Sequence, residues 1–533
     1  MPQASAQTGH EGPVHLPRDY NAASHFIDRH LREGRADKIA IIDDRGRYSY
    51  RELAERVNRA GNMLKSLGVT QEQRIAVCLL DSIDFPAVFW GAIKIGAVPI
   101  AINTLLTPSD YDFMLRDSRA RVLVVSAELE EKFRPILRGQ PHLKTVIVSG
   151  AKGEALRTHA SLAHLCAEAS DRLDAAPTVA DEPAFWLYSS GSTGAPKGAI
   201  HLHGDFVQTA VLYGENVLGI REDDVVFSAA KLFFAYGLGN NSTFPLHVGA
   251  TAVLMAERPT PAAVMRVLNA HRPSIFYGVP TLYAAILADP ALGPVDGLKI
   301  CVSAGEALPE DISRRWKERF GVEILDGIGS TEMLHIFVSN RRDDMRYGTT
   351  GKPVPGYQAR LVTEDGGEAG VDEIGELVVC GPSSSPYYWN NRERSLNTFR
   401  GPWTHTGDKY SRDKDGFFRY AGRTDDMMKV SGIWVSPFEV ESALMAHPKI
   451  LEAAVVGATD SDDLVKPKAF IVLKEGESGS AALADEIKTF VKDRLAPYKY
   501  PRWIEFRNDL PKTATGKIQR FKFREAESKA AGA

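Results

Sequence analysis

A stretch rich in glycine and hydroxyl side chains directly follows an apolar run in the first half of the chain. Residues 184–188 have the composition of a buried strand, and residues 189–198 then read Ser-Ser-Gly-Ser-Thr-Gly-Ala-Pro-Lys-Gly. Glycine lets the backbone approach a ligand closely, and consecutive N–H groups in such a turn bind anions. A flexible surface loop is the alternative. The residues that would surround a phosphate are Ser189, Ser190, Gly191, Ser192, Thr193, Gly194 and Lys197.

The same stretch is not a Walker A loop, because Gly198 and not Ser or Thr follows Lys197. Instead, residues 189–198 resemble the phosphate-binding signature of the adenylate-forming superfamily, which includes acyl-CoA synthetases, peptide-synthetase adenylation domains and beetle luciferases. The resemblance extends over about residues 18–525. Further stretches resemble motifs of this family, in the family's order: residues 48–53, 89–108, 326–333, 403–408, 422–432 and 511–520.

The chemistry that this resemblance implies is the activation of a carboxylate by ATP. The carboxylate attacks the α-phosphorus and pyrophosphate leaves, so charge builds up on phosphate oxygens and the site needs Mg²⁺ and preorganised cations. By resemblance, Glu332 binds Mg²⁺, Thr331 contacts the α-phosphate and Lys517 stabilises the transition state of adenylation. Considered alone, Glu332 and Lys517 would be solvated surface charges.

The nucleoside of ATP would be held by residues in three of these motifs and by residues 305–307. The resemblance assigns Asp408 to the two ribose hydroxyls and Arg423 as its partner at the ribose. The walls of the adenine slot would be Gly305, Glu306, Ala307, Asp326, Gly327 and Ile328.

The second half-reaction of the family is attack of the thiol of coenzyme A on the acyl adenylate. The family presents a different face of its small C-terminal domain for this step. The resemblance makes Asp425 the hinge, because hinges are a few residues that absorb a large change of φ and ψ. Lys429 and Gly432 would then move to the site, with Gly432 in the channel for coenzyme A.

The identity of the acid is predicted from residues near these motifs. Residues 231–241 contain aromatic side chains and glycines but no carboxylate that could bind an ammonium group, which argues against an amino acid. A short, flat, apolar pocket would suit an aromatic ring, although the aromatic residues could also be ordinary core. Residues 20–43, 234–240 and 382–399 resemble the benzoate–CoA ligase branch of the family. The expected acid-binding residues are Phe234, Ala235, Tyr236, Gly237, Ala304, Gly329, His335 and Ile336.

The elements that must position these residues alternate between strands and helices. Residues 38–50 predict a hairpin, and Ser49 with Glu52 forms a capping box that opens an amphipathic helix. Continuous apolar strands predict an α/β fold with mostly parallel sheets, followed by a β-rich subdomain over residues 359–420. We expect a large N-terminal domain over residues 1–424 and a small, mobile α+β domain over residues 425–533. The C-terminal end is interpreted as an Ala-rich tail.

Composition limits the class of protein. A chain of 533 residues is too long for one hydrophobic core, and a net charge of −4 makes nucleic acid an unexpected partner. Residues 1–17 lack the apolar stretch of a signal peptide, and no apolar run is long enough to span a membrane. The four cysteines form no CxxC pair, which fits reduced thiols in the cytoplasm. A monomer or a homodimer is expected.

These observations predict an AMP-forming ligase that joins benzoate to coenzyme A with ATP and Mg²⁺. Two alternatives are a ligase for a substituted benzoate and a stand-alone enzyme that loads an aryl acid onto a carrier protein. A luciferase-like oxygenase would share the fold, but no residue points to oxygen chemistry. A nucleotide-binding protein without activity is disfavoured because Glu332, Asp408, Lys429 and Lys517 are all present.

Overall fold

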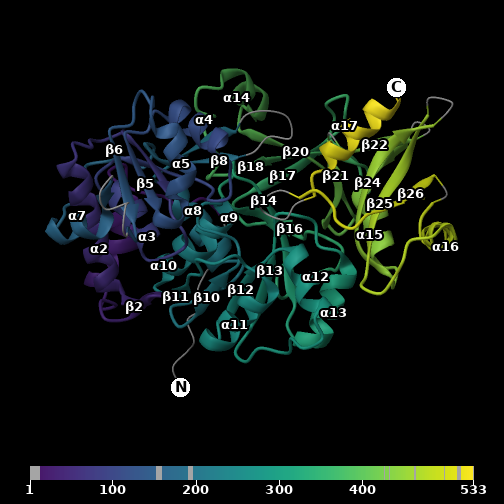
Figure 1. Cartoon of the computed structure of the whole chain (residues 1–533), viewed down its shortest axis with the longest axis horizontal. Helices are drawn as coiled ribbons and strands as arrows, with labels where there is room; N and C mark the ends of the chain where they lie inside the picture. The colour runs from purple at the N-terminus through teal and green to yellow at the C-terminus, as the bar shows by residue number, and fades with distance from the viewer. Residues whose placement is uncertain are drawn as a thin grey trace.

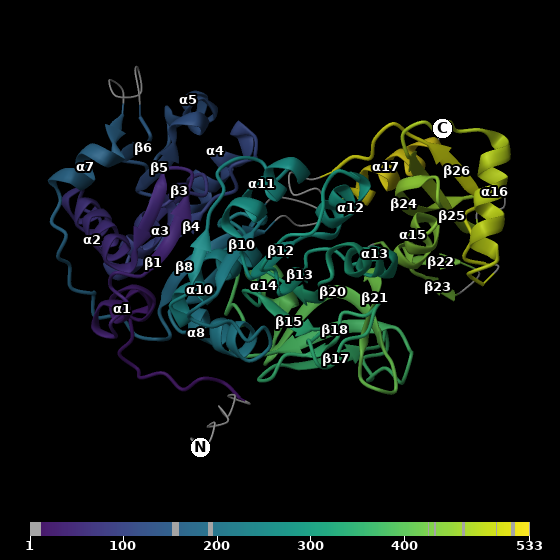
Figure 2. The ribbon, with the colours of Figure 1, turned by 90° about the horizontal axis from the view of Figure 1, so that it is seen from below.

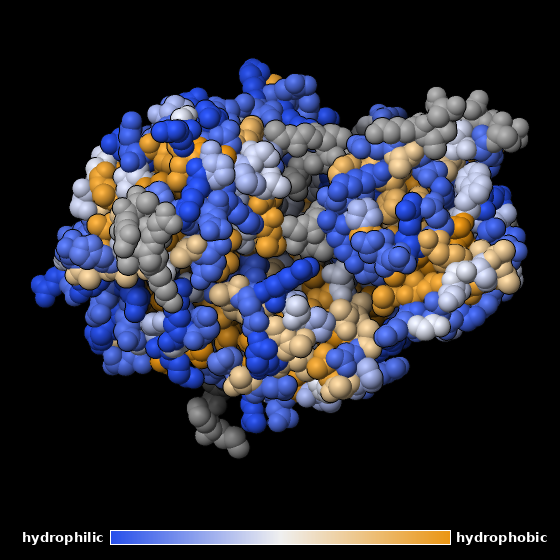
Figure 3. Space-filling view, in the orientation of Figure 1, coloured by the Kyte–Doolittle hydropathy of each residue, from blue (hydrophilic) through white to orange (hydrophobic). Residues whose placement is uncertain are grey.

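The computed structural model describes residues 12–151, 159–189, 196–424, 426–430, 433–460, 464–496, 498–512 and 518–531. Figures 1 and 2 show a large part, coloured purple to green, with a small C-terminal part in yellow-green beside it. On the face shown in Figure 3, hydrophilic residues are spread over both parts and a hollow lies between them. The predicted α/β class is confirmed.

The first sheet of the large part is mostly parallel. Its strand order is β7-β6-β5-β3-β4-β8-β9, and only the β8–β9 pair is antiparallel. Strands β3 and β5 are almost fully buried because helices cover both faces of the sheet. The strands are β3 (Arg74–Cys78), β4 (Val98–Ala101), β5 (Val122–Ser126), β6 (Thr145–Ser149), β7 (Ala160–Ser161), β8 (Pro183–Ser189) and β9 (Lys197–Leu202).

The second sheet has nine strands in the order β16-β15-β14-β13-β12-β10-β11-β1-β2. The neighbours from β14 to β1 are parallel, and the antiparallel pairs lie at the two edges. The strands are β1 (Ile39–Asp43), β2 (Gly46–Ser49), β10 (Val225–Ser228), β11 (Thr251–Val253), β12 (Ile275–Gly278), β13 (Ile300–Ser303), β14 (Ile324–Gly329), β15 (Ile336–Ser339) and β16 (Lys352–Pro353).

Helices pack around these sheets, and several of them begin at a side-chain cap. The capping box is confirmed: the Ser49 side chain accepts a hydrogen bond from the Glu52 N–H, and the Glu52 carboxylate accepts from the Ser49 N–H. The π-helical segments are η1 (Ser24–Asp28), η3 (Ala210–Glu215) and η4 (Gly239–Thr243), and η2 (Ala127–Leu129) is a 3₁₀ turn. The α-helices of the large part are α1 (Arg29–Arg32), α2 (Tyr50–Ser66), α3 (Asp84–Lys94), α4 (Pro108–Ser118), α5 (Glu130–Leu137), α7 (Leu162–Glu168), α8 (Asp205–Thr209), α9 (Ala235–Leu238), α10 (Phe244–Val248), α11 (Pro261–His271), α12 (Pro280–Ala288), α13 (Glu310–Phe320) and α14 (Arg392–Thr398).

A β-rich sheet and a small α+β part complete the chain. The sheet joins β17 (Gln358–Val362), β18 (Gly375–Cys380), β19 (Phe399–Arg400), β20 (Trp403–Arg412) and β21 (Phe418–Arg423), and it matches the predicted β-rich region. The small part contains β22 (Met428–Val430), β23 (Ile433–Val435), α15 (Pro437–Met445), β24 (Ile450–Thr459), β25 (Val465–Leu473), α16 (Ala481–Lys492), β26 (Trp503–Phe506) and α17 (Arg520–Ala531).

The last helix of the chain was not predicted from the sequence. Residues Arg520–Ala531 form helix α17, which packs against β24. Phe523 stacks on Phe470 of β25 with ring centroids 4.1 Å apart, so a tertiary contact holds a helix that composition alone did not indicate. Within the part of the chain that the structure describes, no helix combines the length and the apolar character needed to cross a membrane.

Three buried histidines make the fold sensitive to acid. His30, His203 and His335 are at most 3% exposed, and burial lowers their pKa values to about 3, 4 and 3. An unfolded histidine has a pKa near 6.5, so the stabilisation is fully present above about pH 6.5 and is lost as the pH falls. Each histidine should lower the free energy of unfolding by about 1.4 kcal/mol per pH unit below that point.

Urea unfolding at about pH 7.5 and 5.5 measures this dependence. His203→Gln should remove the contribution of about one proton to the pH dependence of the free energy of unfolding. His164→Gln changes a side chain that is 70% exposed and should leave this dependence unchanged. Equal stability of the wild-type chain at both pH values would show that these histidines are not neutral in the fold.

Candidate active site

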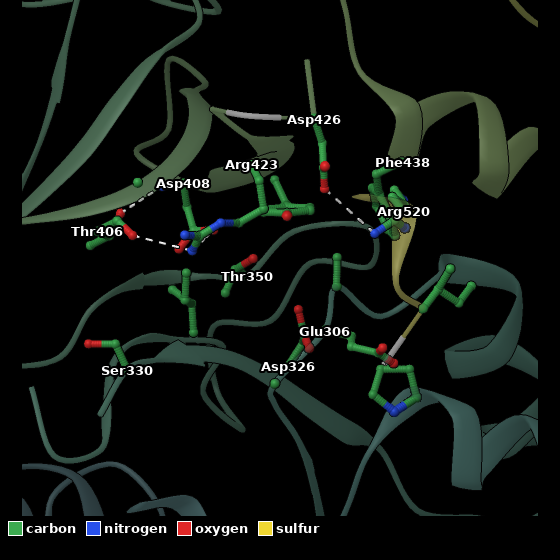
Figure 4. A pocket seen from close by; sticks show the side chains of 18 of the residues that line it. Glu306, Asp326, Ser330, Thr350, Thr406, Asp408, Arg423, Asp426, Phe438 and Arg520 are labelled. Carbon is green, nitrogen blue, oxygen red and sulfur yellow. Dashed lines mark hydrogen bonds and ion pairs between the residues drawn. The ribbon is translucent and has the colours of Figure 1, made fainter. Parts of the chain in front are cut away.

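A cavity of about 850 Å³ lies where the ends of the strands of the large part meet the small C-terminal part. Figure 4 shows side chains from both parts pointing into it, with Asp326 and Ser330 on one side and Asp426 and Arg520 on the other. The cavity brings together most of the nucleotide residues that the sequence predicts. Those that line it are Ser189, Lys197, Gly305, Glu306, Ala307, Asp326, Gly327, Ile328, Glu332, Asp408 and Arg423.

At the phosphate end of the predicted site, a lysine and a carboxylate share one tyrosine. Lys197 Nζ lies 3.7 Å from Glu332 Oε1, and the Tyr388 hydroxyl donates a 2.6 Å hydrogen bond to the same oxygen. Ser189 Oγ lies 3.4 Å from Glu332 Oε1 as a weaker donor. Ser190, Gly191, Ser192, Thr193 and Gly194 lie outside the described residues. The hairpin of β8 and β9 therefore supplies the two ends of the predicted phosphate loop, next to a carboxylate.

The charge states of Lys197 and Glu332 depend on each other. Burial lowers the pKa of Lys197, and Glu332 opposes that effect. Burial disfavours the charged form of Glu332, but the Lys197 ammonium and the Tyr388 hydroxyl hold the pKa of Glu332 below its usual range. Glu332 is therefore an ionised acceptor in the cavity wall.

A single ionised carboxylate of this kind fits Mg²⁺ in a nucleotide site. Mg²⁺ is usually bound by one or two carboxylates, with phosphates and water completing its octahedral shell. The described residues contain no group of three or more His, Cys, Asp or Glu that could hold a metal by themselves. One ionised carboxylate suits an ion whose other ligands come from phosphates and water.

The predicted ribose site follows from the pairing of two strands. Asp408 of β20 lies opposite Arg423 of β21, and Arg423 Nη1 lies 3.1 Å from Asp408 Oδ1. Gly407 precedes Asp408 with φ of 72°, a conformation that glycine adopts without strain. The Asp408 N–H donates to Thr406 Oγ1, which fixes the turn (Figure 4). The carboxylate of Asp408 therefore lies in the cavity wall on a rigid support.

The predicted adenine walls come from two neighbouring parallel strands. Gly305, Glu306 and Ala307 follow β13, whereas Asp326, Gly327 and Ile328 are in β14. Burial raises the pKa of Asp326 well above its usual range, although N–H groups of Leu308 and Gly327 and the hydroxyl of Thr350 oppose this shift. The Asp326 carboxyl group lines the cavity, where it could contact a polar edge of a ligand.

Most of the predicted acid-binding residues lie outside the lining of the cavity. A Cβ added to Gly327, which lines the cavity, would lie 3.0 Å from Ile336 Cγ2, so Gly327 approaches Ile336 closely. His335 Nε2 lies 3.3 Å from the Tyr236 carbonyl oxygen and 3.2 Å from Asn240 Oδ1. Both neighbours are acceptors, so Nε2 carries the proton of the neutral ring. Of the predicted set, Gly329 lines the cavity, and the others lie outside its lining: Phe234, Ala235, Tyr236, Gly237, Ala304, His335 and Ile336.

Several predicted site residues do not line the cavity or lie outside the described part of the chain. Thr331 is not among the cavity-lining residues, and its carbonyl accepts a 2.7 Å hydrogen bond from His201 Nε2. Lys429 is in β22, and its side chain is outside the described part of the structure. Asp425, Gly432 and Lys517 also lie outside the described residues.

Sequence reasoning missed two features of the cavity. Tyr388 lies within residues 382–399, which resemble a branch of the family, but no local pattern connects a tyrosine there with Glu332. Arg520 lines the cavity, binds Glu441 through two nitrogens at 2.8 and 2.6 Å and lies 3.9 Å from Asp426. An arginine three residues after a predicted catalytic lysine was the available signal for this cluster.

Comparisons with known proteins agree with this geometry. The family model "AMP-binding enzyme" matches residues 27–389, and the model "AMP-binding enzyme C-terminal domain" matches residues 439–517. The benzoate–CoA ligase of Thauera aromatica is 62% identical over 96% of this chain and 97% of its own length. The 4-hydroxybenzoate–CoA/benzoate–CoA ligase of Rhodopseudomonas palustris is 52% identical over 95% of this chain and 94% of its own length.

Solved structures show the same similarity. A crystal structure of the anthranilate CoA ligase AuaEII with anthranoyl-AMP has a TM-score of 0.94 and 44% identity, covering 97% of this chain and 99% of that one. The benzoate CoA ligase of Burkholderia xenovorans LB400 has a TM-score of 0.88 and 51% identity, covering 95% of this chain and 100% of that one. The sequence matches span both the large part and the small part, and the chain belongs to the AMP-binding enzyme family.

Proposed function

We propose that this chain is an ATP-dependent benzoate–CoA ligase. Benzoate and ATP give benzoyl-AMP and pyrophosphate, and coenzyme A then gives benzoyl-CoA and AMP. The observation that carries this proposal is the cavity that Lys197, Glu332 and Asp408 line together, with Gly327 of the same lining packed closely against Ile336. The similarity over nearly the whole chain to the benzoate–CoA ligase of Thauera aromatica supports it.

In this proposal the residues of the large part bind and orient the nucleotide. Lys197 and the loop before it contact the phosphates, Asp408 accepts the ribose hydroxyls, and Asp326 lies at the adenine edge. Glu332 holds Mg²⁺, which supplies positive charge for the phosphate oxygens when it is bound. Thr331 contacts the α-phosphate. The exposure of Asp408 and Glu332 to one cavity supports these roles.

The aromatic acid is proposed to bind against residues 234–237 and the strand edge that carries Ala304, His335 and Ile336. Burial keeps His335 neutral, with a pKa lowered to about 3. The Tyr236 hydroxyl donates to the carbonyl oxygens of Gly278 and Val302, at 3.3 Å each, so the backbone fixes its position. No carboxylate is present in residues 231–241, which favours an uncharged ring over an amino acid.

The two half-reactions are proposed to use two orientations of a small domain over residues 425–533. Lys517 would serve adenylation, Lys429 and Gly432 would serve thioester formation, and Asp425 would be the hinge. The contacts of Arg520 with Asp426 and Glu441, next to the proposed hinge, support a division of the chain at this point. We also propose a cytoplasmic enzyme that acts as a monomer or homodimer.

A panel of acids tests the proposed substrate. Release of AMP is followed with ATP, Mg²⁺ and coenzyme A for benzoate, 3- and 4-hydroxybenzoate, 2-aminobenzoate, acetate, palmitate and phenylalanine. Benzoate should have the highest kcat/KM. A methylene in an apolar pocket is worth about 1–3 kcal/mol, so even small additions to the ring should cost roughly tenfold or more. Efficient use of palmitate or phenylalanine would contradict the proposal.

The same assay separates the two alternatives. The relative from Rhodopseudomonas palustris, at 52% identity, favours a test of ring hydroxyls. A higher kcat/KM for 4-hydroxybenzoate than for benzoate would assign the substituted acid. AMP release with benzoate that does not increase with coenzyme A would favour an enzyme that loads a carrier protein.

A further inference from the structure

Tyr388 reaches the cavity from a segment that is bound to the strand after the phosphate loop. The Ile200 N–H donates to the Tyr387 carbonyl at 3.3 Å, and the Trp389 N–H donates to the Gly198 carbonyl at 2.8 Å. Residues 387–389 thus lie along β9, the strand that begins with Lys197. This pairing fixes where the Tyr388 side chain enters the cavity.

The Tyr388 side chain contacts both charged groups at the phosphate end. Its hydroxyl donates to Glu332 Oε1 at 2.6 Å and accepts from Lys197 Nζ at 3.2 Å. The ammonium also lies 4.6 Å from the centre of the tyrosine ring, within the range of a cation–π contact. Tyr388 is only 2% exposed, and its ring packs on Phe399 with centroids 5.1 Å apart. The buried Tyr388 hydroxyl therefore bonds to these two groups and not to solvent.

These contacts give the two oxygens of the Glu332 carboxylate different surroundings. Oε1 receives the Tyr388 hydroxyl, with Ser189 Oγ at 3.4 Å and Lys197 Nζ at 3.7 Å from the same atom. A hydrogen bond to a charged acceptor at short distance is stronger than one between neutral groups. Oε1 is therefore occupied by protein donors, whereas no side chain in the described part of the structure donates to Oε2, which leaves that oxygen for a cation.

We propose that Tyr388 is a positioning residue that fixes Glu332 through Oε1, directs Oε2 to the cation, and holds Lys197 beside the carboxylate until phosphates bind. This inference rests on the proposed function only in taking MgATP as the ligand of the cavity. When phosphate oxygens arrive, Lys197 exchanges the tyrosine oxygen for a phosphate oxygen, while the bond from Tyr388 to Glu332 remains. The tyrosine hydroxyl thus links the two groups that bind the charged end of the nucleotide.

Nucleotide binding without catalysis tests this role. Calorimetry with α,β-methylene ATP measures affinity in Mg²⁺ and in EDTA for the wild-type chain, for Tyr388→Phe and for the matched control Tyr387→Phe. Tyr387 is adjacent, but its side chain is 41% exposed. Loss of a hydrogen bond to a charged group should reduce the gain in affinity from Mg²⁺ about tenfold or more in Tyr388→Phe. Affinity in EDTA should not fall, and Tyr387→Phe should match the wild type.

An unchanged gain from Mg²⁺ in Tyr388→Phe would overturn the proposal, as would an equal loss of affinity with and without Mg²⁺, which would indicate a general structural role. An unfolded Tyr388→Phe protein would also contradict it, because a hydroxyl that only positions Glu332 leaves the packing on Phe399 intact. The assay contains neither an aryl acid nor coenzyme A. Failure of benzoate as a substrate would therefore leave the result for Tyr388 interpretable.

Discussion

Glu332→Gln should reduce formation of the acyl adenylate on the order of a thousandfold. The substitution removes the charge that is proposed to bind Mg²⁺. It also places an amide where Oε1 now accepts from Tyr388 at 2.6 Å and lies 3.7 Å from Lys197, so one orientation of the amide would direct N–H groups at these donors. The measurement is exchange of labelled pyrophosphate into ATP in the presence of benzoate.

Glu376→Gln is the matched control for this prediction. Glu376 is also a carboxylate in the cavity wall, but it lies 3.3 Å from His405 Nδ1 and makes no contact with Lys197 among the described side chains. A general loss of negative charge from the cavity would affect both variants alike. Comparable rates of pyrophosphate exchange for Glu332→Gln and Glu376→Gln would therefore contradict the proposal that Glu332 binds Mg²⁺.

Gly239→Ala should reduce kcat/KM for benzoate about a hundredfold while nucleotide affinity is preserved. A Cβ at this position would lie 2.3 Å from His335 Cδ2 and 2.6 Å from Nε2, which is too close for any carbon. His335 cannot retreat easily, because its ring lies between Tyr213, Tyr236 and Phe244 at centroid distances of 5.3, 5.6 and 4.5 Å. Displacement of about 1 Å in a binding site costs on the order of a hundredfold in rate.

Steady-state kinetics with benzoate and calorimetry with an ATP analogue measure the two parts of this prediction. Gly293→Ala is the control, because a Cβ there meets nothing within 4 Å. In a helix, alanine is otherwise more stable than glycine by about 1 kcal/mol, so any loss at Gly239 comes from the clash. Unchanged kinetics for folded Gly239→Ala would place the acid away from His335.

Local features of the fold could be predicted because they depend on neighbouring residues. The capping box at Ser49 and the buried strands at β3, β5 and β12 follow from side-chain types within a few positions. Helix α17 could not be predicted in this way, because its stability comes from contact with β24 and from Phe523 against Phe470. Tertiary packing, not propensity, decides such an element.

The candidate site also combines features that local sequence could predict with features that depend on tertiary contacts. Motifs identified residues on neighbouring strands of one antiparallel pair, such as Asp408 of β20 opposite Arg423 of β21. The link from Tyr388 to Glu332 joins two connecting segments, one between β14 and β15 and the other between β18 and α14, and no periodicity of the sequence connects them. The predicted acid-binding residues were named as a group, but spacing could not show that most of them lie outside the lining of the cavity.

Transfer of oxygen from the acid to AMP tests the central claim most directly. Benzoate with both carboxylate oxygens replaced by ¹⁸O is incubated with the purified chain, ATP, Mg²⁺ and coenzyme A, and AMP and pyrophosphate are analysed by mass spectrometry. If the carboxylate attacks the α-phosphorus, cleavage of benzoyl-AMP by the thiol leaves one ¹⁸O in AMP and none in pyrophosphate. Unlabelled AMP, or formation of ADP and labelled phosphate, would contradict an acyl adenylate and with it the proposed ligase.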